Sequence, residues 1–134
     1  MQGNKMKKII LDLCGGTGAW SKPYSDAGYD VRIITLPEWD VYEAIIVSSD
    51  LVFYNGRKQM AIPINNIYGI LAAPPCDQFS FAKTTGKPRD LKQGMEVVRA
   101  CLRIIWGVQY RLKSPYAKET NLKFWAIENP HGLL

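Results

Sequence analysis

The chain has 134 residues, of which 47% are hydrophobic and 22% are charged. This length suits one domain spanning residues 1–134, since domains usually have about 100 to 200 residues. The composition is that of an ordinary globular protein, which excludes disorder, a collagen and a membrane bundle. The apolar runs are far too short to span a bilayer, and Asp12 interrupts the run behind the first lysines, so neither a membrane segment nor a signal peptide is expected.

The charge is basic, with 17 lysines and arginines against 12 acids and a formal net charge of +5. An excess of this size fits a polyanionic partner such as nucleic acid, although many small proteins are mildly basic without one. The three cysteines, Cys14, Cys76 and Cys101, have no metal-ligand spacing, and the chain has one histidine. We therefore expect no disulfide and no metal site, and the reducing cytoplasm is the natural location.

The first half of the chain begins with a βαβ pattern. The run Ile9–Leu13 is apolar except for Asp12 and does not alternate, which is typical of a strand buried on both faces of a parallel sheet. The turn Gly15-Gly16-Thr17-Gly18 follows, and then a short helix that Ser21 could cap. A second buried strand is predicted over residues 31–36.

The rest of the chain predicts a hairpin, two strands and one long helix. Residues 51–54 and 60–62 flank an Asn-Gly pair that suits a tight turn. Buried strands are predicted over residues 67–73 and 124–127, and a three-to-four spacing of apolar residues predicts a helix over residues 91–112. Alternating strands and helices indicate an α/β fold with a mostly parallel sheet, in which ligands bind at the carboxyl ends of the strands.

The glycine-rich turn after the first strand is the first candidate site. Glycines there let the backbone approach a ligand closely. The turn lacks the spacing of a dinucleotide fold and the lysine of a P-loop, so an adenosine-containing ligand without phosphates fits better than a phosphate. The alternative is a purely structural turn.

The second and third candidate sites follow the two later strands. Pro74-Pro75 stiffens the chain before Cys76, which could act as a nucleophile, the alternative being a cysteine packed in the core, as we expect of Cys101. Glu128 closes the last strand and would suit a general acid if burial raised its pKa; alternatively it points to solvent. Between these sites lies a basic loop over residues 83–92, which could hold a phosphate backbone or be a solvated loop.

Together, these motifs in this order resemble the DNA cytosine-5 methyltransferase family of phages and bacterial restriction-modification systems. Asp12-Leu13-Cys14-Gly15-Gly16-Thr17-Gly18-Ala19-Trp20-Ser21 is similar to the family's first motif, which binds S-adenosylmethionine. Pro74-Pro75-Cys76-Asp77-Gln78-Phe79-Ser80 is similar to its nucleophile motif, and Glu128-Asn129-Pro130 stands where the family has Glu-Asn-Val. The resemblance covers the front half of the family's catalytic core.

The resemblance implies a class I S-adenosylmethionine-dependent methyltransferase fold, that is, a Rossmann-like sheet, in truncated form. It implies a methyl transfer to carbon 5 of cytosine in DNA, with Cys76 as nucleophile and Glu128 as acid. The implied cofactor contacts are Asp12, Cys14, Gly16, Thr17, Gly18, Trp20, Leu36, Asp40 and Pro74, and the implied DNA contacts are Pro75, Ser80, Lys83, Lys87, Arg89 and Asn129.

The sequence also departs from the family pattern. Cys14 replaces a usual Phe, Ala19 a Gly, Asp77 a Gln and Pro130 a Val, and either Glu38 or Asp40 must serve as the acidic residue for the cofactor ribose. The family's target recognition domain is not in this sequence, so a missing C-terminal region or a second polypeptide would supply it.

Two other functions remain open. The chain could bind S-adenosylmethionine or DNA without turnover. A methyltransferase acting on an amino group of adenine or cytosine is disfavoured, because those enzymes have Asp or Asn before Pro-Pro and an aromatic residue after it, where this chain has Ala73 and Cys76.

Overall fold

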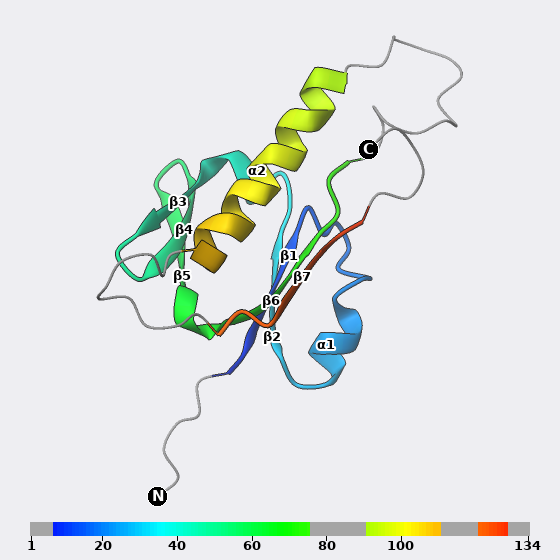
Figure 1. Cartoon of the computed structure of the whole chain (residues 1–134), viewed down its shortest axis with the longest axis vertical. Coiled ribbons are helices and arrows are strands. Elements are labelled where there is room, and N and C mark those ends of the chain that lie inside the picture. Colours follow the sequence, from blue (N-terminus) through cyan, green and yellow to red (C-terminus); the bar gives the residue numbers. More distant parts are fainter. Residues whose placement is uncertain (1–6, 76–90, 111–120, 129–134) are drawn as a thin grey trace, which may run out of the picture.

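The computed structural model describes residues 7–75, 91–110 and 121–128. Within these ranges the chain forms a four-stranded parallel sheet, a three-stranded antiparallel sheet and two α-helices (Figure 1). One hydrophobic core joins both sheets to the longer helix, so the two sheets belong to one folded unit.

The parallel sheet has the strand order β2-β1-β6-β7. Its strands are β1 (Ile9–Leu13), β2 (Asp30–Ile34), β6 (Ile67–Ala72) and β7 (Phe124–Ile127). Every residue of the central strand β1 is buried, as its non-alternating apolar run predicted. The short helix α1 (Lys22–Asp26) connects β1 to β2.

The antiparallel sheet lies between β2 and β6 in the sequence and has the order β3-β4-β5. Its strands are β3 (Ala44–Val47), β4 (Asp50–Asn55) and β5 (Lys58–Pro63), with the 3₁₀ turns η1 (Val41–Glu43) before it and η2 (Ile64–Asn66) after it. Asn55 pairs with Lys58 across a two-residue turn in which Gly56 has φ +60°. This confirms the hairpin predicted from the Asn-Gly pair.

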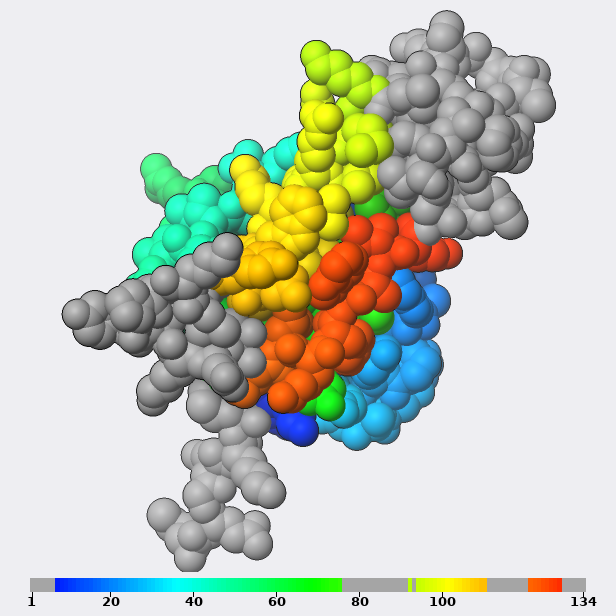
Figure 2. Space-filling model, viewed as in Figure 1, coloured from blue at the N-terminus to red at the C-terminus, as the bar shows by residue number. Residues whose placement is uncertain are grey.

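The long helix α2 (Leu91–Tyr110) covers the core on the side of the antiparallel sheet. Its buried side chains, such as Ile105 and Val108, join Leu11 and Phe53 in one cluster. In Figure 1, α2 and the antiparallel sheet lie to one side of the parallel strands and α1 lies to the other. Figure 2 shows β7, in red and orange, bordered by α2 on one side and by the blue surface around α1 on the other.

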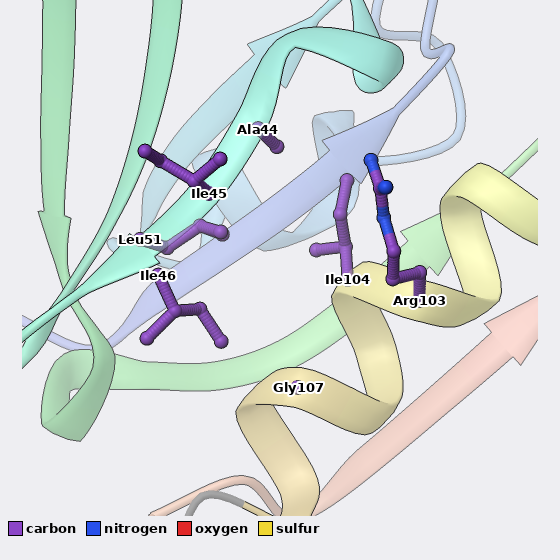
Figure 3. Close-up of a pocket in the computed structure, with 7 residues that line it drawn as sticks. All are labelled: Ala44, Ile45, Ile46, Leu51, Arg103, Ile104 and Gly107. Atoms are coloured by element: carbon purple, nitrogen blue, oxygen red, sulfur yellow. The ribbon is translucent and has the colours of Figure 1, made fainter.

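A hollow of about 280 Å³ separates β3 from α2. Figure 3 shows Ile46 of β3 pointing toward the helix turn that carries Gly107. A methyl group added at Gly107 would lie 2.7 Å from Cδ1 of Ile46, so the missing side chain of Gly107 lets β3 approach the helix. The hollow is apolar except for Arg103, whose guanidinium donates to the carbonyl of Tyr42 at 3.4 Å.

The opposite face of the parallel sheet carries an aromatic cluster. Tyr24 of α1 stacks on Phe124 of β7, and Tyr68 of β6 meets the Phe124 ring edge-on. Gly69, which pairs with Phe124, makes room for this ring, because an added methyl would lie 2.7 Å from its Cε2 atom. The cluster therefore anchors the edge strand β7 to the sheet.

The predicted class I, Rossmann-like methyltransferase fold is wrong. That fold requires strands and helices to keep alternating after the second strand, whereas an antiparallel sheet follows β2 here and the described residues contain only two α-helices. The physical reason lies in residues 44–56. The β-branched run of β3 favours a strand, and Ser48, with φ +55°, closes a tight turn into β4.

Candidate functional site

The chain turns sharply where β1 ends. Cys14, Gly16 and Gly18 all have positive φ angles, of 58°, 56° and 80°. The amide of Cys14 donates to the carbonyl of Ile34 at 2.7 Å, which ties the turn to the end of β2. At Gly18 a side chain would meet both an unfavourable φ and the end of Ile33, so glycine is required there. The predicted glycine-rich turn is therefore tightly held.

Asp12 lies beneath this turn and is fully buried. The hydroxyl of Ser21 donates to Oδ2 of Asp12 at 2.5 Å, while Oδ1 has no partner among the described residues. Ser21 is the N-cap residue of α1, but its side chain does not cap the helix, because it is committed to Asp12. Burial raises the pKa of the Asp12 carboxyl, and the hydrogen bond from Ser21 offsets only part of this effect.

Replacing Asp12 by asparagine is expected to make the free energy of unfolding less dependent on pH above about 4, the ordinary pKa of an aspartate side chain. Because its folded-state pKa is raised, Asp12 favours folding fully below its ordinary pKa of 3.8, and this contribution is lost as the pH rises through the raised value. A difference of one pKa unit between the two states corresponds to about 1.4 kcal/mol. Urea unfolding of both proteins across this range tests the expectation; a constant difference between them would contradict it.

A pocket of about 230 Å³ opens beside the turn, beyond the ends of β1 and β2. Its walls come from the turn, from the segment between β2 and β3, from α2 and from the end of β6. The lining residues are Cys14, Gly16, Ile34, Thr35, Leu36, Trp39, Asp40, Val41, Tyr42, Pro75 and Val97. The pocket is thus mostly apolar, with one carboxylate and two aromatic side chains.

Hydrogen bonds engage two of the polar groups that line this pocket, the carboxylate of Asp40 and the thiol of Cys14. Oδ1 of Asp40 accepts the amide of Tyr42 at 2.9 Å, which fixes the carboxylate at the start of η1. The pKa of the Cys14 thiol is lowered, chiefly because the thiol of Cys101 on α2 donates a hydrogen bond to it. The same contact, together with burial, raises the pKa of Cys101. Cys14 is therefore the more readily ionised of the two thiols.

The ends of three strands meet next to this pocket. The amide of Ala73 donates to the carbonyl of Leu13 at 3.0 Å, and the amide of Glu128 donates to the carbonyl of Ala72 at 2.8 Å. The glycine-rich turn, the Pro-Pro segment and Glu128 therefore lie side by side at the carboxyl ends of the parallel strands. This is the arrangement that parallel strands predicted for the three candidate sites.

The predicted cofactor residues divide into two groups. Those that line the pocket are Cys14, Gly16, Leu36 and Asp40, and they are joined by Pro75, which was predicted to contact DNA. The others do not line it: Asp12, Gly18 and Pro74 are buried, whereas Thr17 and Trp20 are exposed on the turn. Of the two candidate acids for a ribose, only Asp40 lines the pocket, because Glu38 faces solvent and pairs with Lys58 at 3.6 Å.

The predicted catalytic and DNA-contacting residues lie largely outside the described ranges. Glu128 is described and exposed, so the burial expected to raise its pKa is not found. Pro75 is exposed at the rim of the pocket. The predicted residues outside the described ranges are Cys76, Ser80, Lys83, Lys87, Arg89 and Asn129.

Sequence reasoning missed several residues that line the pocket. Trp39 and Tyr42 come from a segment in which we predicted no element, and a Trp-Asp pair in an irregular stretch was the one signal available. Val97 lies on α2, one helical turn before Cys101, and the apolar spacing of this helix did not distinguish the pocket from the core.

Comparisons with family models, with curated proteins and with solved structures found no match for this chain. In the part of the chain that is described, no helix is long and apolar enough to cross a membrane. The same residues contain no group of three or more His, Cys, Asp or Glu side chains that could hold a metal ion.

Proposed function

We propose that this protein transfers a methyl group from S-adenosylmethionine to carbon 5 of cytosine in DNA. The observation that carries the proposal is the position of Pro75, which lines the same pocket as the glycine-rich turn and immediately precedes Cys76 in the chain. Because Cys76 is the next residue in the sequence, this position of Pro75 supports assigning the candidate nucleophile to the same site as a pocket for a small ligand.

The pocket suits the nucleoside part of this cofactor. Trp39 offers an aromatic surface for a base, and Ile34 and Val41 supply apolar contacts. The carboxylate of Asp40 can accept hydrogen bonds from ribose hydroxyls, since only its Oδ1 is bonded within the described residues. The volume of about 230 Å³ is below the range of about 300 to 1,000 Å³ usual for whole drug-sized ligands, which fits a part of the cofactor.

The proposed chemistry begins with Cys76, whose thiolate adds to carbon 6 of the cytosine ring. The proposed acid is Glu128, which is exposed in the free protein and would be covered by the bound base. It donates a proton to ring N3, so that the electron pair released into the ring makes carbon 5 nucleophilic. When bound, S-adenosylmethionine supplies the electrophilic methyl group that carbon 5 attacks. A base from the solvent then takes the proton from carbon 5, the Cys76 thiolate leaves, and the N3 proton returns to Glu128, which restores the aromatic ring.

DNA is the proposed substrate, and the target base must leave the duplex to reach a cysteine. The positive net charge supports a polyanionic partner. The proposed DNA contacts are Pro75, Ser80, Lys83, Lys87, Arg89 and Asn129. A cysteine nucleophile must stay reduced, which agrees with a cytoplasmic location.

Covalent trapping tests the proposal. The chain is incubated with S-adenosylmethionine and DNA containing 5-fluorocytosine, and the denatured products are analysed by mass. After methyl transfer the fluorine blocks the final elimination, so a working cysteine stays attached to the DNA. We expect an adduct at Cys76. Cofactor binding without an adduct would instead support the alternative of a module that binds without turnover.

Replacing Trp39 by leucine is expected to weaken S-adenosylmethionine binding by about tenfold, since a lost base-stacking contact costs about 1 to 3 kcal/mol. Leucine keeps an apolar side chain against the core, so the fold should be retained. Trp106→Leu is the matched control, because Trp106 is 49% exposed on α2 and does not line the pocket. Titration calorimetry measures both variants, and equal affinities would place the cofactor elsewhere.

A further inference from the structure

A separate pocket, lined mainly by polar residues, lies at the other end of the parallel sheet, where the strands begin. It has a volume of about 440 Å³, which is in the usual range of about 300 to 1,000 Å³ for ligand sites. Three lysines and three asparagines dominate its walls. The lining residues are Lys7, Lys8, Asn65, Asn66, Tyr68, Asn121 and Lys123.

The topology of the sheet brings these residues together. Lys8 immediately precedes β1, Asn66 ends η2 immediately before β6, and Lys123 immediately precedes β7. Because β1, β6 and β7 are parallel neighbours, their amino-terminal ends lie side by side. The side-chain amide of Asn121 donates to the backbone carbonyl of Asn65 at 2.6 Å, and the backbone amide of Lys123 donates to the backbone carbonyl of Tyr68 at 2.8 Å. The pocket walls are therefore tied to one another.

The positive charge of this pocket is not neutralised within the described part of the chain. None of Lys7, Lys8 and Lys123 forms an ion pair with another described residue. Asp30, a nearby acid, is engaged by Arg32 through two bonds of 2.8 and 2.9 Å. The pKa of Asp30 is held below its ordinary value by that hydrogen bonding first, and more weakly by the charge of Lys7.

Tyr68 and Asn66 add to the lysines in making this pocket suitable for an anion. Nζ of Lys8 lies 4.7 Å from the centre of the Tyr68 ring, so a cation–π contact orients this ammonium group. Asn66 is partly buried and brings an amide that can donate to an oxygen. Ammonium and amide donors converging on one cavity suit the several acceptor oxygens of a phosphate group.

We propose that the pocket formed by Lys7, Lys8, Asn66 and Lys123 binds phosphate groups. The source is either a free nucleotide or polyphosphate, or the phosphodiester backbone of a nucleic acid. This inference does not depend on the proposed methyl transfer, because the phosphate pocket and the Trp39 pocket lie at opposite ends of the same strands.

The test compares two double variants of the full chain that remove the same charge. Lys7→Ala/Lys123→Ala changes the phosphate pocket. Lys22→Ala/Lys58→Ala changes two lysines on α1 and β5 that are exposed and lie outside it. Calorimetry measures binding of inorganic pyrophosphate and of ATP, and fluorescence anisotropy measures binding of a labelled DNA duplex at several salt concentrations. Thermal unfolding checks that each variant is folded.

We expect the pocket variant to lose about tenfold or more in affinity for at least one probe, and the control variant to keep its affinity. A loss for pyrophosphate and ATP alone identifies a free phosphate ligand. A loss for the duplex, with a smaller salt dependence by about two counterions, identifies a nucleic-acid backbone. Equal losses in both double variants, or no binding of any probe by the wild-type chain, would overturn the proposal.

Asn66→Asp provides a second, more conservative test. It puts a carboxylate into the phosphate pocket without changing the size of the side chain, so it should weaken phosphate binding by repulsion. Unchanged binding of pyrophosphate and duplex by this folded variant would also contradict the proposal. Because S-adenosylmethionine binding at the Trp39 pocket is measured separately, failure of one proposal leaves the other intact.

Discussion

Cys76→Ala is expected to abolish methyl transfer to DNA while leaving S-adenosylmethionine binding within about twofold of the wild-type affinity. The methyl side chain of alanine cannot add to carbon 6, so carbon 5 stays a poor nucleophile and at least about 10³-fold of the rate is lost. The described walls of the pocket that we assign to the cofactor come from other residues, such as Trp39 and Asp40, which is why binding should survive. Transfer of a labelled methyl group measures the first effect and calorimetry the second.

The retained cofactor affinity is the internal control of this experiment, because it shows that the variant is folded around an intact pocket. Cys76→Ser provides a further control, since a hydroxyl has nearly the shape of the thiol and is a far weaker nucleophile. Transfer that persists in both variants would remove Cys76 from the mechanism. The resemblance to cytosine-5 methyltransferases would then have no chemical basis in this chain.

The parallel sheet was largely predictable because its strands are rich in apolar residues. The predicted ranges of β1 and β7 agree with the structure and β6 differs only at Ala73, whereas β2 spans Asp30–Ile34 instead of residues 31–36. The burial predicted for β2 and β7 is wrong, because most of their residues are only half-buried. A strand that is buried on both faces, such as β1, can be predicted from its apolar composition alone, because such a run is unfavourable in contact with solvent. The meeting of three strand ends at one edge followed from their parallel direction.

The antiparallel sheet shows what sequence patterns leave undetermined. The hairpin of β4 and β5 carries a local signal in Gly56, whereas β3 has four residues, three of them exposed. A short edge strand is stabilised by pairing with β4 and by contact with α2 through Ile46 and Gly107, and neither contact can be read from the local sequence. The expectation of alternating strands and helices failed for this reason.

The pocket beside the glycine-rich turn combines segments that are far apart in the sequence. Cys14 comes from the turn after β1 and Cys101 from α2, so the hydrogen bond between their thiols joins segments that no local sequence pattern connects. Ser21 was predicted to cap a helix, yet its hydroxyl is taken by the buried carboxylate of Asp12. The local sequence indicates that Ser21 can cap a helix, but the buried carboxyl group of Asp12 needs a hydrogen-bond donor and takes its hydroxyl instead.

Gly15→Ala is expected to destabilise the fold by about 1 to 3 kcal/mol, the usual cost of overpacking a tight interior. A methyl group at this position would lie 2.6 Å from both carboxylate oxygens of Asp12. That carboxylate cannot move aside, because it is fully buried and bonded to Ser21 at 2.5 Å. The turn would have to shift instead, and with it Cys14 and Gly16 of the pocket, so S-adenosylmethionine binding should weaken as well.

Two comparisons separate this steric effect from the general cost of removing a glycine. Gly56→Ala meets no atom within 4 Å but has φ +60°, so it should cost only the backbone strain of about 1 to 2 kcal/mol and leave ligand binding unchanged. In an Asp12→Ala background the clash disappears, and the added cost of Gly15→Ala should fall by about 1 kcal/mol or more. Chemical unfolding of the four proteins of this cycle measures the coupling. Strictly additive effects would show that the carboxylate of Asp12 does not dictate glycine at this turn.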